Sequence, residues 1–241
     1  NRVRRQRQMC IRDRYSRIKN DENLNKEIIN EALNFGQPEK IIWYEKPVVK
    51  KVRQAVAGQW TEVWDKNKLP KNYLKNFFDK VPPIEYALHH ESHAAAGAFT
   101  SPFREAAIVV LDAIGEFNTC SVWKYEHPNK LKKIRVANYP HSFGLLYSAF
   151  TQRCNLKPNE EEYIMMGMSA YGKPRYVHNI KIDFIDSIYP FRLKSNPHIG
   201  IGDYLPNASH EDIACSIQAI ADEVIVEYCS CLLYTSPSPR D

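Results

Sequence analysis

The spacing of hydrophobic residues is helical in the first third of the chain. From Asn23 to Phe35 apolar residues recur three or four positions apart, which predicts a helix that ends at Gly36. The same spacing predicts two more helices, and two short apolar runs predict strands. The two helices are predicted at Val48–Val56 and Tyr73–Phe78. The two strands are predicted at Lys40–Tyr44 and Ile84–Leu88.

Strand-like patterns replace the helical ones after Glu105. Ala106–Asp112 is almost continuously apolar and β-branched, which predicts a central strand covered on both faces. Thr119–Glu126 and Leu131–Asn138 follow after short turns and are predicted to be its antiparallel partners. A buried strand with two such partners is how an RNase H-like half of the actin-type fold begins.

The remainder of the chain is predicted to be mainly helical. Leu145–Arg153 and Glu211–Tyr228 carry apolar residues at helical spacing, whereas Pro174–Ala208 shows no clear period and is predicted to be irregular. The sequence contains no internal repeat, Walker-type loop or GxGxxG motif.

Both ends look foreign to the protein. Residues 4–13 and 231–241 resemble in-frame translations of sequencing-library adapters, so residues 1–14 and 231–241 are expected to be disordered artefacts flanking a domain at 15–230. The formal net charge of the whole chain is +5. Leaving out both ends removes seven arginines and two aspartates, so 26 basic and 26 acidic residues remain. This balance gives no support for nucleic-acid binding.

The cysteines and the hydropathy favour a cytoplasmic protein. Cys120, Cys154, Cys215 and Cys229 are widely spaced and form no CxxC pair, which fits reduced, mostly buried thiols. No apolar run approaches the roughly 20 residues that span a bilayer, so no membrane association is expected.

The candidate chemistry lies in the segment from His89 to Asp112. His89 and His93 are four residues apart and would share one helix face, where both could bind one metal ion. Alternatively, they only make hydrogen bonds at a helix N-terminus. Asp112 ends the predicted strand, at a sheet edge where α/β proteins bind ligands, and could complete the site or merely cap a turn. A zinc protease is disfavoured because the HExxH pattern fails: Glu91 follows His89 by two positions, and His90 has no histidine four residues later.

Several sequence blocks, in order, resemble the O-carbamoyltransferases of the nodulation-protein and antibiotic type. The blocks begin with HHESHAA and the strand before Asp112, continue with YPHSFGLLY and EYIMMGMSAYG, and end with DIACSIQ. The resemblance covers essentially all of Tyr15–Tyr228. It implies an α/β, actin-like (RNase H-like, ASKHA) N-terminal domain that is incomplete at both ends.

The resemblance also implies an activity and its cofactors. Enzymes of this family make carbamoyl-adenylate from carbamoyl phosphate and ATP in a C-terminal YrdC-like domain. The actin-like domain then transfers the carbamoyl group to a hydroxyl of a small-molecule or sugar acceptor. A divalent metal, expected to be Fe(2+), lies at the site, although two histidines and one carboxylate also suit manganese or zinc. The biosynthetic full-length enzyme would therefore bind ATP and metal, whereas the isolated fragment is expected to be inactive.

Site residues follow from the matching positions. The resemblance assigns the metal to His89, His93 and Asp112. Asp112 is also expected to be catalytic, together with His90, which could move the proton of the acceptor hydroxyl.

The nucleotide site is expected around two other blocks. The segments around Ser142 and Gly167 resemble those that line carbamoyl-adenylate, and Gly144 or Gly167 would let the backbone approach it closely. His141 is expected to hydrogen-bond this ligand. Ile164 stands where relatives often carry lysine, which argues against a lysine–phosphate contact there.

Two other function classes stay open. One is a threonylcarbamoyl-transfer enzyme of tRNA modification, which the YPHSFGLLY block and the balanced charge disfavour. The other is a non-catalytic module that binds a nucleotide or a sugar.

Overall fold

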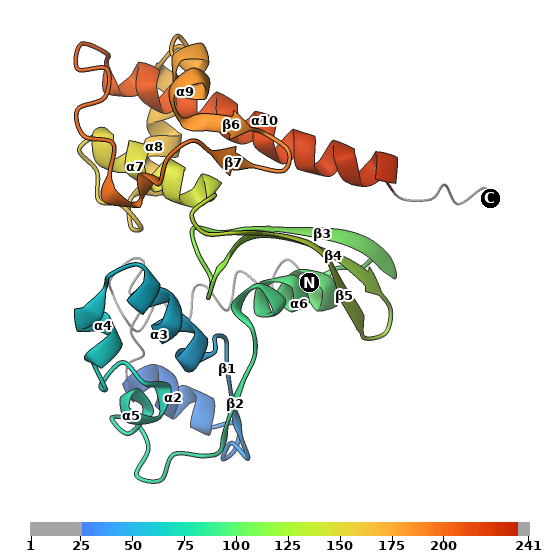
Figure 1. Cartoon of the computed structure of the whole chain (residues 1–241). Coiled ribbons are helices and arrows are strands. Elements are labelled where there is room, and N and C mark those ends of the chain that lie inside the picture. The colour runs from blue at the N-terminus through green and yellow to red at the C-terminus, as the bar shows by residue number, and fades with distance from the viewer. Residues whose placement is uncertain (1–25, 236–241) are drawn as a thin grey trace, which may run out of the picture. The chain divides into compact units, whose positions relative to one another are not determined.

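The computed structural model describes residues 26–235, apart from the side chains of residues 199 and 233–235. Contacts divide the chain into two units, Asn1–Ala87 and Leu88–Asp241 (Figure 1). The predicted Asn23–Phe35 helix corresponds to α2, Lys26–Leu33, while residues 23–25 lie outside the described part.

The N-terminal unit is a short βαβ arrangement. Its strands β1 (Ile41–Trp43) and β2 (Ile84–Tyr86) are parallel and pair Ile41 with Ile84. Parallel strands need a crossover connection. Three helices provide it, namely α3 (Pro47–Val56), α4 (Trp60–Trp64) and α5 (Pro70–Leu74).

The predicted helix over Tyr73–Phe78 is wrong in its position. Helix α5 starts at Pro70 and ends at Leu74, because proline at the first helical position loses no hydrogen bond and already has a helical φ. Proline breaks the interior of a helix, whereas Pro70 stands at the start of this one.

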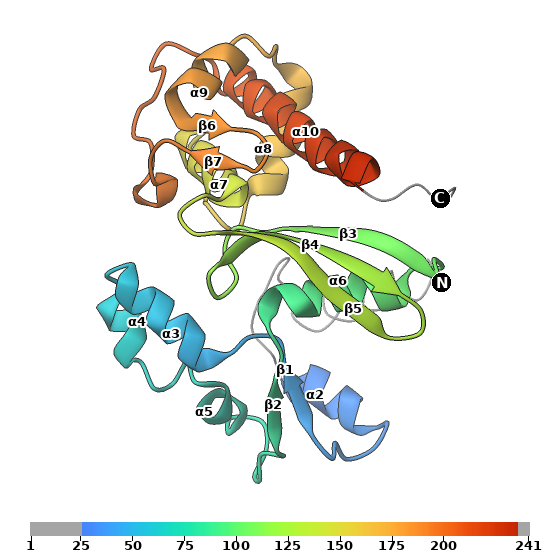
Figure 2. The ribbon, with the colours of Figure 1, turned by 45° about the vertical axis from the view of Figure 1, so that its right-hand side comes forward.

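A three-stranded antiparallel sheet forms the middle layer of the C-terminal unit (Figure 2). It consists of β3 (Glu105–Leu111), β4 (Asn118–Glu126) and β5 (Lys130–Asn138), in that order. Among the described residues β4 is the middle strand, and β3, where a central strand was predicted over Ala106–Asp112, is an edge strand that pairs only with β4. Val109 and Val110 of β3 nevertheless pack toward opposite faces of the sheet. The strand is apolar because both of its faces are covered, although only one of its edges is paired.

Helix α6 (His89–Thr100) covers one face of this sheet. Its buried residues His90, Ala94 and Ala98 recur every four positions, and Ala94 packs against Val110 and Trp123. These small alanine side chains let the helix lie close to the strands. Because His89 and His93 are each one position before a buried residue, they lie on the neighbouring helix face.

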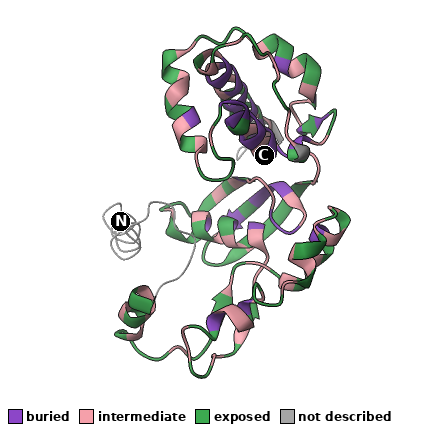
Figure 3. Cartoon of the chain, turned by 90° about the vertical axis from the view of Figure 1, so that its left-hand side faces the viewer, coloured by how far each residue is buried: buried purple, intermediate pink, exposed green. Residues whose placement is uncertain are grey.

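The opposite face of the sheet carries the main core. Helices α7 (Phe143–Arg153), α8 (Glu162–Met168), α9 (Val177–Phe184) and α10 (His210–Thr235) surround it. Cys120 and Val122 of β4 pack with these helices, and Figure 3 shows buried residues along α10. The fully buried residues on α10 are Ile213, Ala214, Ser216, Ile217, Ile220 and Val224. The predicted helices over Leu145–Arg153 and Glu211–Tyr228 are therefore confirmed.

The segment predicted to be irregular contains regular structure. Within Pro174–Ala208 lie helix α9 and a small hairpin of β6 (Ile185–Ser187) and β7 (Arg192–Leu193), followed by the 3-10 turn η2 (Pro197–Ile199). Helix α9 was missed because only eight residues carry its pattern. A second 3-10 turn, η1 (Ser169–Tyr171), follows α8.

The tail is partly helical. Residues 1–14 and 236–241 lie outside the described part, but α10 continues through Thr235, into the segment expected to be disordered. Leu232 packs against the main core, which explains the continuation. Of the helices in residues 26–235, none combines the length and the apolar character that crossing a bilayer requires.

Two of the four predicted thiols are buried, and this gives a testable difference. Burial raises the pKa of Cys120 and of Cys154 to about 11, whereas Cys229 is exposed. Because the thiolate is the nucleophile, iodoacetamide at about pH 8 should label Cys229 and spare both buried thiols. Peptide mass spectrometry measures the labelling, with denatured protein as the control. Labelling of native Cys154 as fast as Cys229 would contradict the prediction.

Candidate metal centre

Helix α6 presents two imidazoles from its first two turns. The helix starts at His89 because Leu88 has an extended backbone, with φ −74° and ψ 142°. His89 and His93 are one helical turn apart, so their rings lie side by side with centroids 4.7 Å apart. The predicted shared helix face is confirmed.

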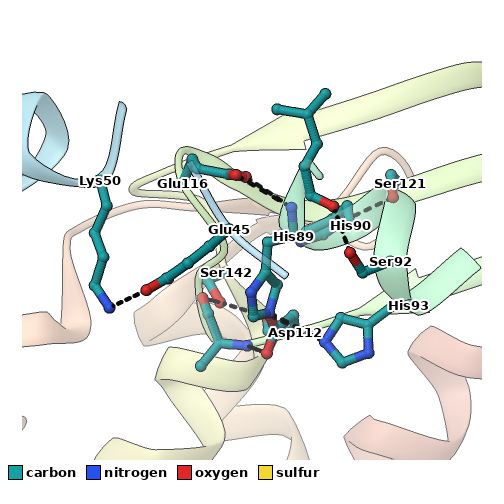
Figure 4. Close-up of polar contacts among 12 residues, drawn as sticks. Glu45, Lys50, His89, His90, Ser92, His93, Asp112, Glu116, Ser121 and Ser142 are labelled. Carbon is teal, nitrogen blue, oxygen red and sulfur yellow. Dashed lines mark hydrogen bonds and ion pairs between the residues drawn. The ribbon is translucent and has the colours of Figure 1, made fainter. Parts of the chain in front are cut away.

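Asp112 comes from the sheet and follows the last residue of β3. Its backbone N–H extends the ladder by donating to the Thr119 carbonyl at 3.0 Å. Its Oδ1 accepts the backbone N–H of Ala113 at 2.8 Å, which leaves Oδ2 to face the helix. The strand end therefore fixes one carboxylate oxygen opposite the two imidazoles (Figure 4).

The three side chains converge on one point. His89 Nε2 lies 2.8 Å from Asp112 Oδ2 and 3.0 Å from His93 Nε2. His93 Nε2 lies 4.0 Å from the same Oδ2. Among the described residues, this is the one cluster of three or more metal-ligand side chains with such convergence, with all ligand atoms within 4.8 Å. The metal role of these residues stays a prediction.

The three side chains are better suited to bind a cation than to form hydrogen bonds with one another. His89 Nε2 carries either one hydrogen or one lone pair. If His89 Nε2 carries a hydrogen, it can donate to the Asp112 carboxylate but cannot accept a hydrogen bond from His93. If it carries a lone pair, it can accept from His93 but is repelled by the carboxylate. No single protonation state of His89 therefore satisfies both contacts well. A divalent cation accepts all three groups, and nitrogen and oxygen ligands of this kind suit iron, manganese or zinc.

The electrostatics of Asp112 give a second prediction. Burial alone would raise the pKa of this carboxyl, but the hydrogen bond and charge of His89 outweigh it, so the pKa lies below its usual value. The carboxylate therefore stabilises the fold above the unfolded pKa of about 3.9, and this stabilisation is lost as the pH falls through the folded pKa. His89→Ala should raise the pKa of Asp112, as measured by carbon NMR titration of the carboxyl.

The more distant histidine is the matched control for that titration. His93 lies 4.0 Å from Asp112 Oδ2, so His93→Ala should move the pKa less than His89→Ala does. Equal shifts from both variants, or none from His89→Ala, would contradict the assignment.

His90 points away from this cluster and into the protein. Its side chain is buried, and its Nδ1 lies 2.7 Å from the Ser121 hydroxyl, which also accepts the Trp123 indole N–H at 2.7 Å. Burial by these neighbours lowers the pKa of His90. This enclosure favours a positioning role for His90 over the expected proton transfer.

Two of the four residues expected at the nucleotide have structural contacts beside Asp112. Ser142 caps α7: its hydroxyl accepts the Leu145 N–H at 3.0 Å and donates to the Ala113 carbonyl at 2.6 Å. A Cβ on Gly144 would come within 2.7 Å of the Ala113 backbone, so glycine allows α7 to lie against this turn. Both residues thus hold the turn that carries Asp112.

Within the described part of the chain, the other two, His141 and Gly167, make no contact with the Asp112 turn that resembles those of Ser142 and Gly144. His141 Nδ1 accepts the Leu193 N–H at 3.2 Å, which ties it to β7. Gly167 is exposed on α8, and a Cβ added to it would meet no atom within 4 Å. The nucleotide roles of all four residues stay predictions.

A cavity of about 230 Å³ opens beside the same turn. Ala113 and Ile114 form one wall and Ser148 and Gln152 of α7 another. A larger cavity of about 620 Å³ lies within the N-terminal unit and is lined mainly by apolar and aromatic residues. The smaller cavity is the more relevant one to the candidate metal centre, because Ala113, the residue after Asp112, lines it.

Sequence reasoning missed one buried acidic residue at the centre. Glu116 is 4% exposed and binds the first backbone N–H of α6. In the sequence, Glu116 is only a carboxylate in the turn that follows the strand before Asp112. Its partner, the backbone N–H of His89, lies 27 positions earlier, so the contact could not be predicted.

Comparisons with known proteins identify one matching family and three relatives. Residues 18–237 match a family model described as "Carbamoyltransferase N-terminus". An uncharacterized protein of Synechocystis sp. is 34% identical over 205 residues, which is 72% of this chain and 32% of the relative. Two uncharacterized proteins of Methanocaldococcus jannaschii are 25% and 24% identical, covering 89% and 75% of this chain and 38% and 32% of theirs. The chain spans about a third of the length of the curated relatives it matches.

Proposed function

Because the chain belongs to the carbamoyltransferase N-terminal family, we propose that it forms the acceptor-side part of an O-carbamoyltransferase. The carbamoyl group would come from carbamoyl phosphate and ATP through carbamoyl-adenylate. A YrdC-like domain would make this intermediate, and a hydroxyl of a small molecule or sugar would receive the carbamoyl group. The observation that carries the proposal is the convergence of His89, His93 and Asp112 at the end of β3.

In this proposal His89, His93 and Asp112 would hold a divalent metal, expected to be Fe(2+). When bound, such a metal supplies Lewis-acid polarisation of a phosphate or carbamoyl oxygen. Asp112 stays ionised at neutral pH because its pKa is lowered, so it is ready to serve as an anionic ligand.

The chain's own residues also shape where the substrate could sit. The side chain of His93 is 55% exposed, so the ligand cluster is open to solvent on that side. The cavity lined by Ala113 and Ile114 lies next to the cluster, because Ala113 directly follows Asp112 in the chain. We infer that the carbamoyl end of the adenylate would face this cavity, whose wall Ser142 and Gly144 hold in place.

The test is transfer of labelled carbamoyl phosphate by the whole protein that contains this chain. It would be incubated with ATP, Fe(2+) and a panel of sugars and other hydroxylated small molecules, and the products separated by mass. Metal-dependent carbamoylation of a hydroxyl, lost in a His89→Ala/His93→Ala variant, is the expected result. Modification of tRNA in place of these acceptors would favour the threonylcarbamoyl-transfer alternative, and nucleotide binding without transfer a non-catalytic module.

A further inference from the structure

Glu116 links the two chain segments that carry the candidate metal ligands. It lies four residues after Asp112, in the turn between β3 and β4, and is 4% exposed. Its Oε1 and Oε2 accept the backbone N–H of His89 at 3.1 and 3.2 Å (Figure 4). One carboxylate therefore joins the first residue of α6 to the Asp112 turn.

This contact does what a helix cap normally does. The first N–H groups of a helix have no partner inside it, and Leu88 provides no side-chain cap for α6. A carboxylate at this end also interacts favourably with the positive end of the helix dipole. The cap comes from the turn and not from the helix's own flank, so it fixes the helix start relative to the turn.

The turn is built for this close approach. A Cβ on Gly115 would come within 2.8 Å of the His90 ring and 3.2 Å of His89 Cβ, so glycine is needed to bring Glu116 near α6. The Gly115 N–H donates to the Asn118 carbonyl at 2.8 Å and closes the turn. On the other side of the helix start, His90 is held by Ser121 of β4.

From these contacts we propose that Glu116 is a positioning residue of the metal centre: it holds His89 at the correct distance from Asp112. The inference rests on the metal ligands of the proposed function and deepens it. Without the carboxylate, the start of α6 loses this hydrogen bond to the turn, and His89 Nε2 is held less firmly opposite Asp112 Oδ2. Partners that orient metal ligands typically contribute 10–100-fold in metal affinity.

The experiment is titration of the 241-residue chain with Co²⁺, by calorimetry and by the visible absorption of the bound ion. Glu116→Ala should weaken Co²⁺ binding about 10–100-fold with the stoichiometry unchanged. Glu116→Gln keeps an oxygen that can accept the same N–H and should retain most of the affinity. Glu126→Ala, on β4 and bound to Lys124 at the surface, is the matched control and should leave the affinity unchanged.

Each outcome decides between two hypotheses. If the wild-type chain binds Co²⁺ and Glu116→Ala binds it equally well, the positioning role is wrong while the metal centre stands. A lower stoichiometry with unchanged affinity would mean a partly unfolded sample and would also overturn the role. No binding by the wild-type chain would overturn the metal centre and this inference together. If Glu116→Ala does not fold, Glu116→Asp, which keeps the charge but shortens the reach, decides in the same way.

Discussion

Asp112→Asn will weaken Co²⁺ binding by more than about 100-fold if Asp112 is a ligand, because it removes the charge of the proposed ligand and second-sphere partners alone contribute about 10–100-fold. The substitution is nearly isosteric. Asparagine keeps an oxygen that can accept the Ala113 N–H at the position of Oδ1, so the turn should hold its shape. The loss would therefore report on the charge at Oδ2 and not on folding. Calorimetric titration at neutral pH measures it.

An exposed aspartate of the same unit provides the control. Asp186 lies on β6 and is exposed, so Asp186→Asn changes the net charge equally without touching the cluster. It should leave Co²⁺ affinity unchanged. Equal weakening by both substitutions would show that the binding is non-specific attraction to the protein's charge, and an unchanged Asp112→Asn would remove Asp112 from the ligand set.

Gly172→Ala will destabilise the fold by about 3 kcal/mol or more, at or beyond the upper end of the usual cost of overpacking. A Cβ at this position would lie 1.9 Å from the carbonyl oxygen of Glu211, which is backbone at the start of α10 and cannot rotate away. The adjacent contact from the Lys173 N–H to Asp212 Oδ1, at 2.8 Å, would be broken if the segments moved apart. Equilibrium unfolding in urea measures the change.

Another glycine of the same sequence block gives a matched comparison. Gly167 lies in α8 with open space where a Cβ would be. Gly167→Ala should therefore be neutral or stabilise the protein by up to about 1 kcal/mol, because alanine loses less backbone entropy in a helix. If Gly172→Ala changes the unfolding free energy by as little as Gly167→Ala, the packing of this segment against α10 is wrong.

The convergence of the candidate metal ligands was predictable because each part of it is local. The spacing of His89 and His93 needs only a helix, and the position of Asp112 needs only a strand that ends there. Their convergence required one further fact, that α6 packs along β3, which the small residues Ala94 and Ala98 make possible. The family model over residues 18–237 shows the family, whereas the metal role of these residues stays a prediction. The actin-like identity of the fold stays a prediction.

The parts that sequence reasoning missed depend on contacts between distant residues. Glu116 has its role only because α6 begins beside it, and nothing in its own neighbourhood indicates that. His90 looks like a free imidazole in the sequence, yet Ser121 and Trp123 enclose it. Similarly, β3 is apolar because helices cover both faces, and the sequence cannot show which strand pairs on two edges.

Ser142 shows a signal that was available and was interpreted differently. A serine three residues before Leu145, at the start of an apolar helical pattern, is a typical N-cap. The family resemblance implies a ligand near Ser142, and the spacing to Leu145 independently indicates that its hydroxyl caps the helix.

The backbone from Asp112 to Ile114 is part of both the candidate metal centre and the wall of the neighbouring cavity. Its first residue supplies the carboxylate, its next two line the cavity, and Ser142 holds the carbonyl of Ala113 between them. A ligand in the cavity that favoured one position of this turn would therefore change the affinity of the proposed cation site at Asp112. By thermodynamic reciprocity, the cation would then change the affinity of that ligand by the same factor.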